Sequence, residues 1–248
     1  MTKSIQMESI IEISGSLTNG RIVTAIESSD LVNLVLEEKK IVLLKNIFPH
    51  EMLIDIRHAV AEWGRQIEPL TVDDWDGNYH RQRAMVSRVN TFPHVLHDYN
   101  FHDFPKLEES LSAKLRGLFD PLRVLYNELV AYDLTFEIPT AGPYLHPQLI
   151  HYPAGGGFFG RHWHNLLPQK LGFIVAVSRY GSDYKCGGTV FDVDGRLVDI
   201  EGIHDLGDVC IWRYDYPHWV KQSDLRDQFN WNSEDGRWVA TLPYFERW

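Results

Sequence analysis

The sequence predicts a mainly β fold with supporting helices, because two patterns divide its 248 residues. The second half carries short apolar runs separated by glycine-containing turns, which is typical of a strand-rich core. The first half carries apolar residues at helical spacing, which predicts helices that pack against that core. With 44% hydrophobic and 23% charged residues, the chain is an ordinary globular protein. We therefore expect a single domain over residues 1–248, with a mixed helical support region over 1–147 and a β core over 148–245.

The support region begins with residues 1–20, where no periodicity favours a particular element. Helical spacing follows over residues 31–37, and the run Lys-Ile-Val-Leu-Leu at 40–44 predicts a short buried strand. After Pro49, apolar residues at helical spacing predict an amphipathic helix that ends at Gly64. These residues are Met52, Leu53, Ile56, Ala59, Val60 and Trp63.

The rest of the support region divides into an irregular part and a helical part. Residues 72–100 show no clear period, so we expect irregular structure or short strands there. From Lys106 the apolar spacing is helical, and Pro121 predicts the start of a second helical segment, because proline fits the first turn of a helix. We expect these helices to support one face of the β core.

The β core is predicted from apolar runs bounded by glycine and polar turns. Its strands begin at Gln148, and further strands are expected over residues 171–177, 187–191, 207–212 and 236–242.

Three histidines in this core are candidate metal ligands. On a strand, residues i and i+2 point to the same face, so His162 and His164 can bind one ion while Trp163 faces away. His218 follows much later, in Tyr-Pro-His-Trp-Val. Three imidazoles with open coordination positions describe a catalytic metal site. An enzyme is therefore the leading hypothesis, with no catalytic residue expected beyond the metal ligands.

In this order of parts the chain resembles the Fe(II)/2-oxoglutarate-dependent dioxygenases, in the branch that includes the prolyl hydroxylases. The resemblance covers roughly residues 148–245, with a vaguer match before them. It implies a double-stranded β-helix core of the jelly-roll or cupin-like type. It also implies Fe(II), the cosubstrate 2-oxoglutarate and O2.

The resemblance assigns roles to individual residues. His162, the position of His164, and His218 become the metal ligands. Arg237 falls where the family places a basic residue that pairs with the distal carboxylate of 2-oxoglutarate, a task that suits the arginine fork. Tyr152 stands where the family often has a tyrosine hydroxyl near the same cosubstrate.

The spacing before Arg237 departs from the family pattern. Residues 221–235 lengthen the usual interval after His218, which makes Arg226 a competing anchor. We favour Arg237 because residues 236–242 predict a strand, whereas residues 221–235 predict a loop able to cover a pocket.

His164 is the main departure, because the family has a carboxylate at this position. A neutral imidazole there makes the site one unit more positive and lowers its affinity for a hard divalent ion. Three histidines also describe zinc sites and iron sites that need no oxoacid. The alternatives are therefore an oxoacid-independent iron dioxygenase, a zinc hydrolase and a non-catalytic ligand-binding relative. A carboxylate supplied from elsewhere is a further option, with four candidates: Asp183, Asp192, Asp194 and Asp215.

The expected reaction is the oxidation of a C–H bond in a small-molecule substrate, by hydroxylation or another oxidative outcome. Candidate substrate-binding residues are Arg88, Tyr144 and Trp231. An arginine that faces the pocket would favour an anionic or amino-acid-like substrate.

Composition excludes several partners. The net charge is −10, and basic residues form no long cluster, so we expect no nucleic-acid binding. No run of 18 apolar residues predicts a membrane span, and no leader-like segment opens the chain, so we expect a cytoplasmic protein. Cys186 and Cys210 are too few for a disulfide framework and are expected to be reduced thiols.

Overall fold

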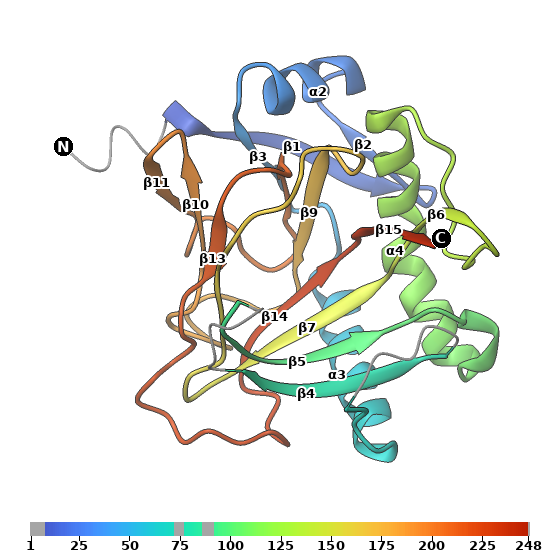
Figure 1. Cartoon of the computed structure of the whole chain (residues 1–248), viewed down its shortest axis with the longest axis vertical. Helices are drawn as coiled ribbons and strands as arrows, with labels where there is room; N and C mark the ends of the chain where they lie inside the picture. Colours follow the sequence, from blue (N-terminus) through green and yellow to red (C-terminus); the bar gives the residue numbers. More distant parts are fainter. Residues whose placement is uncertain (1–7, 72–76, 86–91, 248) are drawn as a thin grey trace.

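A computed structural model describes residues 8–71, 77–85 and 92–247 of the chain (Figure 1). Strands dominate it, which confirms the mainly β fold with supporting helices. Most of the strands join one 13-stranded sheet, and a separate sheet pairs β15 with β6. The strands are β1 (Ile10–Thr18), β2 (Arg21–Thr24), β3 (Ile41–Lys45), β4 (Tyr79–Met85), β5 (His94–Asn100), β6 (Gly142–Leu145), β7 (Gln148–Pro153), β8 (Phe158–His162), β9 (Leu171–Ala176), β10 (Thr189–Val193), β11 (Arg196–Asp199), β12 (Val209–Arg213), β13 (His218–Val220), β14 (Gly236–Thr241) and β15 (Tyr244–Arg247).

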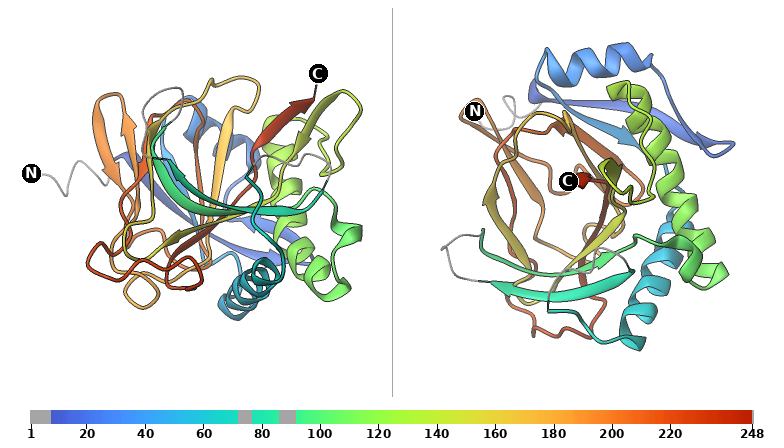
Figure 2. Two further views of the ribbon diagram at one scale, coloured as in Figure 1. Left: turned by 60° about the horizontal axis from the view of Figure 1, so that its bottom comes forward. Right: turned by 45° about the vertical axis from the view of Figure 1, so that its right-hand side comes forward.

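The large sheet curls around an enclosed interior (Figure 2). One part has the strand order β11-β10-β13-β8, and the other has β7-β14-β9-β12-β3-β1-β2. Strand β5 connects the two parts, because His94 and Val95 pair with β8 while residues 97–100 pair with β7. β4 pairs with β5 along its full length. The two parts thus face each other across the space that holds the candidate site.

Three α-helices cover the outer face of the larger part of the sheet (Figure 2, right). Their apolar residues share one core with the outward-facing residues of the strands, such as Val42, Leu149 and Trp238. No helix in the described ranges is long and apolar enough to cross a membrane. The helices are α2 (Ser28–Leu36), α3 (His50–Gln66) and α4 (Glu109–Val130), preceded by the 3-10 turn η1 (Phe104–Lys106).

A second apolar core fills the interior between the two parts of the sheet. Strand alternation separates the two cores, since successive side chains point to opposite faces. On β14, Val239 points into this interior, whereas Trp238 and Ala240 point to the helices. Arg237 and Tyr152 are register partners on β14 and β7, and Tyr152 belongs to the interior core. The interior is therefore apolar, with a few polar side chains placed in it by register.

Two expectations for the support region need correction, and a third is confirmed in one of its two alternatives. Residues 1–20 include β1, which pairs in parallel with β3, so sheet pairing decides a segment whose own pattern favoured no element. Residues 72–100 contain two short strands, β4 and β5, within their described parts, which confirms the short-strand alternative. Pro121 lies inside the continuous helix α4, because the apolar face stays in phase on both sides of the proline and packs against the sheet.

Gly236 gives a test of how tightly β14 is held. Its φ is +123°, and a Cβ there would lie 2.3 Å from the backbone oxygen of Tyr152. We expect Gly236→Ala to lower the free energy of unfolding in urea by about 2–4 kcal/mol, from backbone strain and overpacking together. The matched control is Gly20→Ala, where φ is also positive but no atom lies within 4 Å. It should cost only about 1 kcal/mol, and equal losses in the two variants would contradict the steric argument.

Candidate metal centre

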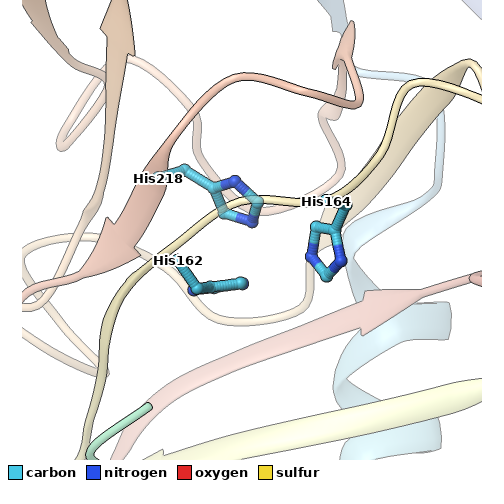
Figure 3. A group of neighbouring side chains, drawn as sticks. All are labelled: His162, His164 and His218. Atoms are coloured by element: carbon cyan, nitrogen blue, oxygen red, sulfur yellow. The ribbon is translucent and has the colours of Figure 1, made fainter. Parts of the chain in front are cut away.

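The structure brings His162, His164 and His218 together (Figure 3). Each offers one ring nitrogen, and these three atoms lie within 4.8 Å of one another. His162 ends β8 and is the register partner of His218, which begins β13. His164 follows in the coil after β8, so the expected strand ends before it, although Trp163 does face solvent. Pairing of two antiparallel strands thus brings in the distant third histidine.

Two of the three rings are held by the same local hydrogen bond. Nδ1 of His162 lies 2.9 Å from the Gly160 carbonyl oxygen, and Nδ1 of His218 lies 2.8 Å from that of Tyr216. A carbonyl oxygen can only accept, so each Nδ1 carries the proton and donates. Nε2 of each ring is then left with a bare lone pair, which is the form that binds a metal ion.

His164 is held differently. No hydrogen bond to either ring nitrogen occurs within the described residues, and the ring instead stacks on Tyr214 at a centroid distance of 4.3 Å and an interplanar angle of 9°. Stacking fixes the ring plane but leaves the choice of the ligating nitrogen open. The ligand that departs from the family pattern is therefore also the least constrained of the three.

Burial keeps all three imidazoles neutral. Burial lowers the pKa of His164 to about 4, with a smaller contribution from the neighbouring His162. Burial also lowers the pKa of His162 and lowers that of His218 well below its usual value. Neutral imidazoles are metal ligands, whereas protonated ones are not. All three imidazoles are therefore neutral at pH 7.

No carboxylate joins the three histidines in the part of the chain that the structure describes. Each of the four aspartates considered as a replacement is paired with a basic side chain instead. The pairs are Asp183 with Arg57, Asp192 with Arg161, Asp194 with Lys39, and Asp215 with Arg213. The site is therefore a neutral three-histidine centre.

Arg237 lies in the interior and is only 3% exposed. Its Nη2 donates to the Thr189 hydroxyl at 2.8 Å, while its buried Nη1 has no hydrogen-bond partner. No carboxylate pairs with it among the described residues. Thr189 lies on β10 two residues before Phe191, the register partner of His218, so roughly 7 Å of strand separates Thr189 from the level of His218. A buried guanidinium with a free donor is an incomplete anion site. Sequence reasoning missed Thr189, which had no motif to mark it.

The other expected site residues lie as follows. Tyr152 is buried in the interior, its ring centroid 5.8 Å from Cζ of Arg237, and burial raises its pKa to about 12. Tyr144 is buried on β6, where its ring contacts those of His102 and Phe245.

Three further candidates lie away from the centre or beyond the described ranges. Trp231 contacts the ring of His97 and lines a pocket on the outer face of the sheet beside α3. We therefore no longer place it at the substrate. Arg226 is exposed at the surface, which favours Arg237 as the interior anchor. Arg88 lies outside the described residues.

The residues present fit Fe(II) and 2-oxoglutarate. Three neutral imidazoles form one face of a metal site, with the Nε2 atoms of two of them fixed by backbone hydrogen bonds. The unpartnered Nη1 of Arg237 lies in the same interior and suits the carboxylate of a dicarboxylate. The three ligands alone fit Zn(II) equally well.

Solved structures resemble the chain in fold, although no protein-family model and no curated protein sequence matches it. A prolyl-4-hydroxylase from Pseudomonas putida is 15% identical, with 89% of this chain and 99% of that one covered at a TM-score of 0.58. A Trichoplax adhaerens prolyl hydroxylase in complex with a hypoxia inducible factor peptide fragment is 16% identical, with 88% and 90% covered at 0.54. A putative oxygenase from Shewanella oneidensis is 14% identical, with 96% and 89% covered at 0.56. The chain thus has the double-stranded β-helix fold of the prolyl-hydroxylase-like oxygenases, as the sequence resemblance implied.

The lowered pKa values predict a particular pH dependence of metal binding. The neutral form of His164 persists down to a pKa of about 4. Co(II) affinity should therefore change little between about pH 8 and pH 5 and be lost as the pH approaches 4. Histidines with the ordinary pKa of about 6.5 would lose affinity already below that pH. The visible absorption of bound Co(II) measures this directly. A steady fall in affinity beginning at pH 6.5 would contradict the prediction.

Proposed function

We propose that the protein is a non-haem Fe(II)/2-oxoglutarate-dependent oxygenase that oxidises a C–H bond of a small molecule. The carrying observation is the combination of a three-histidine centre with a buried arginine that lacks an anionic partner, in one interior. A zinc hydrolase needs the three-histidine centre but does not need the buried arginine. A dicarboxylate cosubstrate accounts for both, because one end would meet the metal and the other Arg237.

In this proposal the bound iron and cosubstrate supply the oxidising chemistry, and the chain's residues bind, orient and exclude water. His162, His164 and His218 would hold the metal and leave its other positions open. Arg237 and Thr189 would fix the distal carboxylate, with the Tyr152 ring beside the guanidinium. The apolar interior strengthens that charge pairing, because low polarity leaves the guanidinium without competing water.

A second function is favoured by one specific observation, the imidazole of His164 where the family has a carboxylate. Three neutral ligands leave the full charge of a divalent ion uncompensated, which lowers the pKa of a metal-bound water. A three-histidine enzyme that needs no oxoacid would use this property, as an iron dioxygenase or a zinc hydrolase. Arg237 would then bind the substrate. If the protein is not catalytic, it would use the pocket only to bind a ligand.

The substrate is proposed to be a small molecule, although a solved structure with this fold holds a peptide. A peptide substrate is therefore the natural comparison in any assay. The two classes differ in what they require of the protein. A peptide needs an extended surface beside the metal centre, whereas a small molecule needs only the residues of the interior and its rim.

Arg237 provides the first functional test. With Fe(II) loaded anaerobically, the parent protein should release succinate from 2-oxoglutarate. Arg237→Gln should raise the KM for 2-oxoglutarate by roughly 30- to 1000-fold, the equivalent of about 2–4 kcal/mol for one partner of a buried charge pair. It should leave the metal content unchanged.

The matched control for Arg237→Gln is Arg196→Gln on the exposed edge strand β11, which should behave as the parent does. The parent should also gain thermal stability on addition of 2-oxoglutarate, and Arg237→Gln should not. Absence of succinate with any metal, together with no stabilisation by 2-oxoglutarate, would reject the proposal in favour of an oxoacid-independent enzyme.

Substitutions of His164 distinguish the 2-oxoglutarate-dependent oxygenase from the enzyme that needs no oxoacid. His164→Asp restores the family's carboxylate and adds one negative charge, so it should tighten Fe(II) binding and preserve or raise succinate yield. In an enzyme built on three neutral ligands, the same change should weaken the native reaction. His164→Ala should lower metal affinity in both cases. Metal analysis and succinate yield, measured side by side, distinguish these results. Unchanged metal content in both variants would show that His164 is not a ligand.

A further inference from the structure

A fourth buried histidine lies next to the metal centre. His94 begins β5 at the joint between the two parts of the sheet, where it is the register partner of Phe159 on β8. The Phe159 ring in turn stacks on His162 at a centroid distance of 4.2 Å. One aromatic ring thus separates His94 from a metal ligand.

His94 is held in the same way as two of the metal ligands. Its Nδ1 lies 2.7 Å from the carbonyl oxygen of Phe92, two residues earlier in the chain. His162 and His218 make the same bond to the residue two positions before them. The carbonyl must accept, so Nδ1 of His94 carries the proton and Nε2 has a bare lone pair.

Nε2 of His94 is buried without a hydrogen-bond partner, and the residue is only 1% exposed. A buried acceptor without a donor costs about 1–3 kcal/mol, so such groups are rare unless a ligand completes them. The nitrogen does not join the three-histidine group. It is therefore available to a donor on a bound molecule.

Arg83 is the charged neighbour of His94 on the same face of the sheet. Arg83 pairs with Leu96 and His94 pairs with Met85, so the two are diagonal neighbours across β4 and β5, roughly 7–8 Å apart at the backbone. Arg83 is also close enough to add to the effect of burial in lowering the pKa of His94. A cation and an acceptor are thus presented side by side.

Arg83 contacts Asp98 less closely than Arg81 does. Asp98 is buried on the interior-facing side of β5, and Arg81 binds both of its oxygens, at 3.1 and 2.6 Å. Arg83 reaches the same carboxylate only at 3.4 Å and is partly exposed. Arg83 is therefore the more loosely held of the two guanidinium groups at this carboxylate.

We propose that Arg83 and His94 form the substrate subsite of this protein, and that it takes a carboxylic acid bearing an N–H or O–H donor. Arg83 pairs with the carboxylate, and Nε2 of His94 accepts the hydrogen bond from the donor. Phe92, whose ring lies 5.5 Å from that of His162 and 6.0 Å from that of Trp163, adds an aromatic wall. Amino acids and N-acylamino acids with apolar side chains fit this chemistry.

The inference rests on the proposed function but is tested by binding as well as by turnover. The probes are the free L-amino acids, their N-acetyl derivatives, and the matching C-terminal amides, which lack the carboxylate. Ligand-observed NMR with metal-free protein detects binding, and succinate release from 2-oxoglutarate with the Fe(II) enzyme detects coupled turnover. We expect acids with apolar side chains to bind and to raise succinate release, and their amides to do neither.

Substitutions of Arg83 and His94 test the two proposed contacts separately. Arg83→Gln should weaken acid binding by at least roughly tenfold, the loss of one charge-assisted contact, whereas Arg83→Lys should retain part of it. His94→Phe should weaken binding and raise the KM of the acid, and His94→Gln, which keeps an acceptor, should recover part of the loss. Iron content and thermal stability are measured for every variant, so that a loss of acid binding can be distinguished from a loss of metal or of folding. Arg196→Gln is the control.

Several outcomes would overturn the subsite. Equal binding of acids and amides would exclude Arg83 as the carboxylate partner. Unchanged acid binding in Arg83→Gln and His94→Phe, or no acid binding at all to the parent, would reject the proposal even if 2-oxoglutarate turnover is normal. Conversely, acid binding that depends on both residues, in a protein that never consumes 2-oxoglutarate, would uphold the subsite and reject the proposed function.

Discussion

The apolar interior between the two parts of the sheet is the constraint on which the site depends. In such a space a polar group without a partner is costly, and a charge is more so. Most polar groups there are satisfied by the chain itself, as Asp98 is by Arg81. Among the unpartnered buried atoms are Nη1 of Arg237, Nε2 of His94 and the indole nitrogen of Trp212. We propose that bound molecules provide the missing partners of Arg237 and His94.

The same constraint sets the chemistry of the metal centre. Burial favours neutral imidazoles, and local bonds to backbone carbonyls select the tautomer that exposes Nε2 in His162 and His218. Burial also keeps the His164 imidazole neutral, but no backbone carbonyl selects its tautomer. His164 lies beyond the end of β8, and its ring is held by stacking on Tyr214. A carboxylate at this position would carry its own charge to the ion. An imidazole supplies only a lone pair, so the bound ion keeps its full charge.

Strand β5 links the N-terminal region to this chemistry. It pairs with both β8 and β7, and therefore connects the two parts of the sheet beside the strand that ends at His162. β4 extends the same face outward and carries Arg83 toward the rim. The segment that differs most between proteins of one fold is often the one that meets the substrate. In this chain Arg83 and His94 lie on regular strands, which hold their side chains by register.

The sequence by itself determined the features whose signals lie in neighbouring residues or in the order of a motif. Strand and helix periodicity predicted the mainly β fold and α2, β3 and α3, and the ordered histidines, arginine and tyrosine of residues 148–245 indicated the candidate site. Those signals lie within a few residues of one another or in a recognisable order. The pairing of β1 with β3, the continuity of α4 through Pro121 and the placement of Trp231 on the outer face were decided by tertiary contacts. The same is true of Thr189 beside Arg237 and of Arg83 beside His94. Each depends on strand register across distant parts of the chain, and a shift of one residue would turn these side chains to the other face of the sheet.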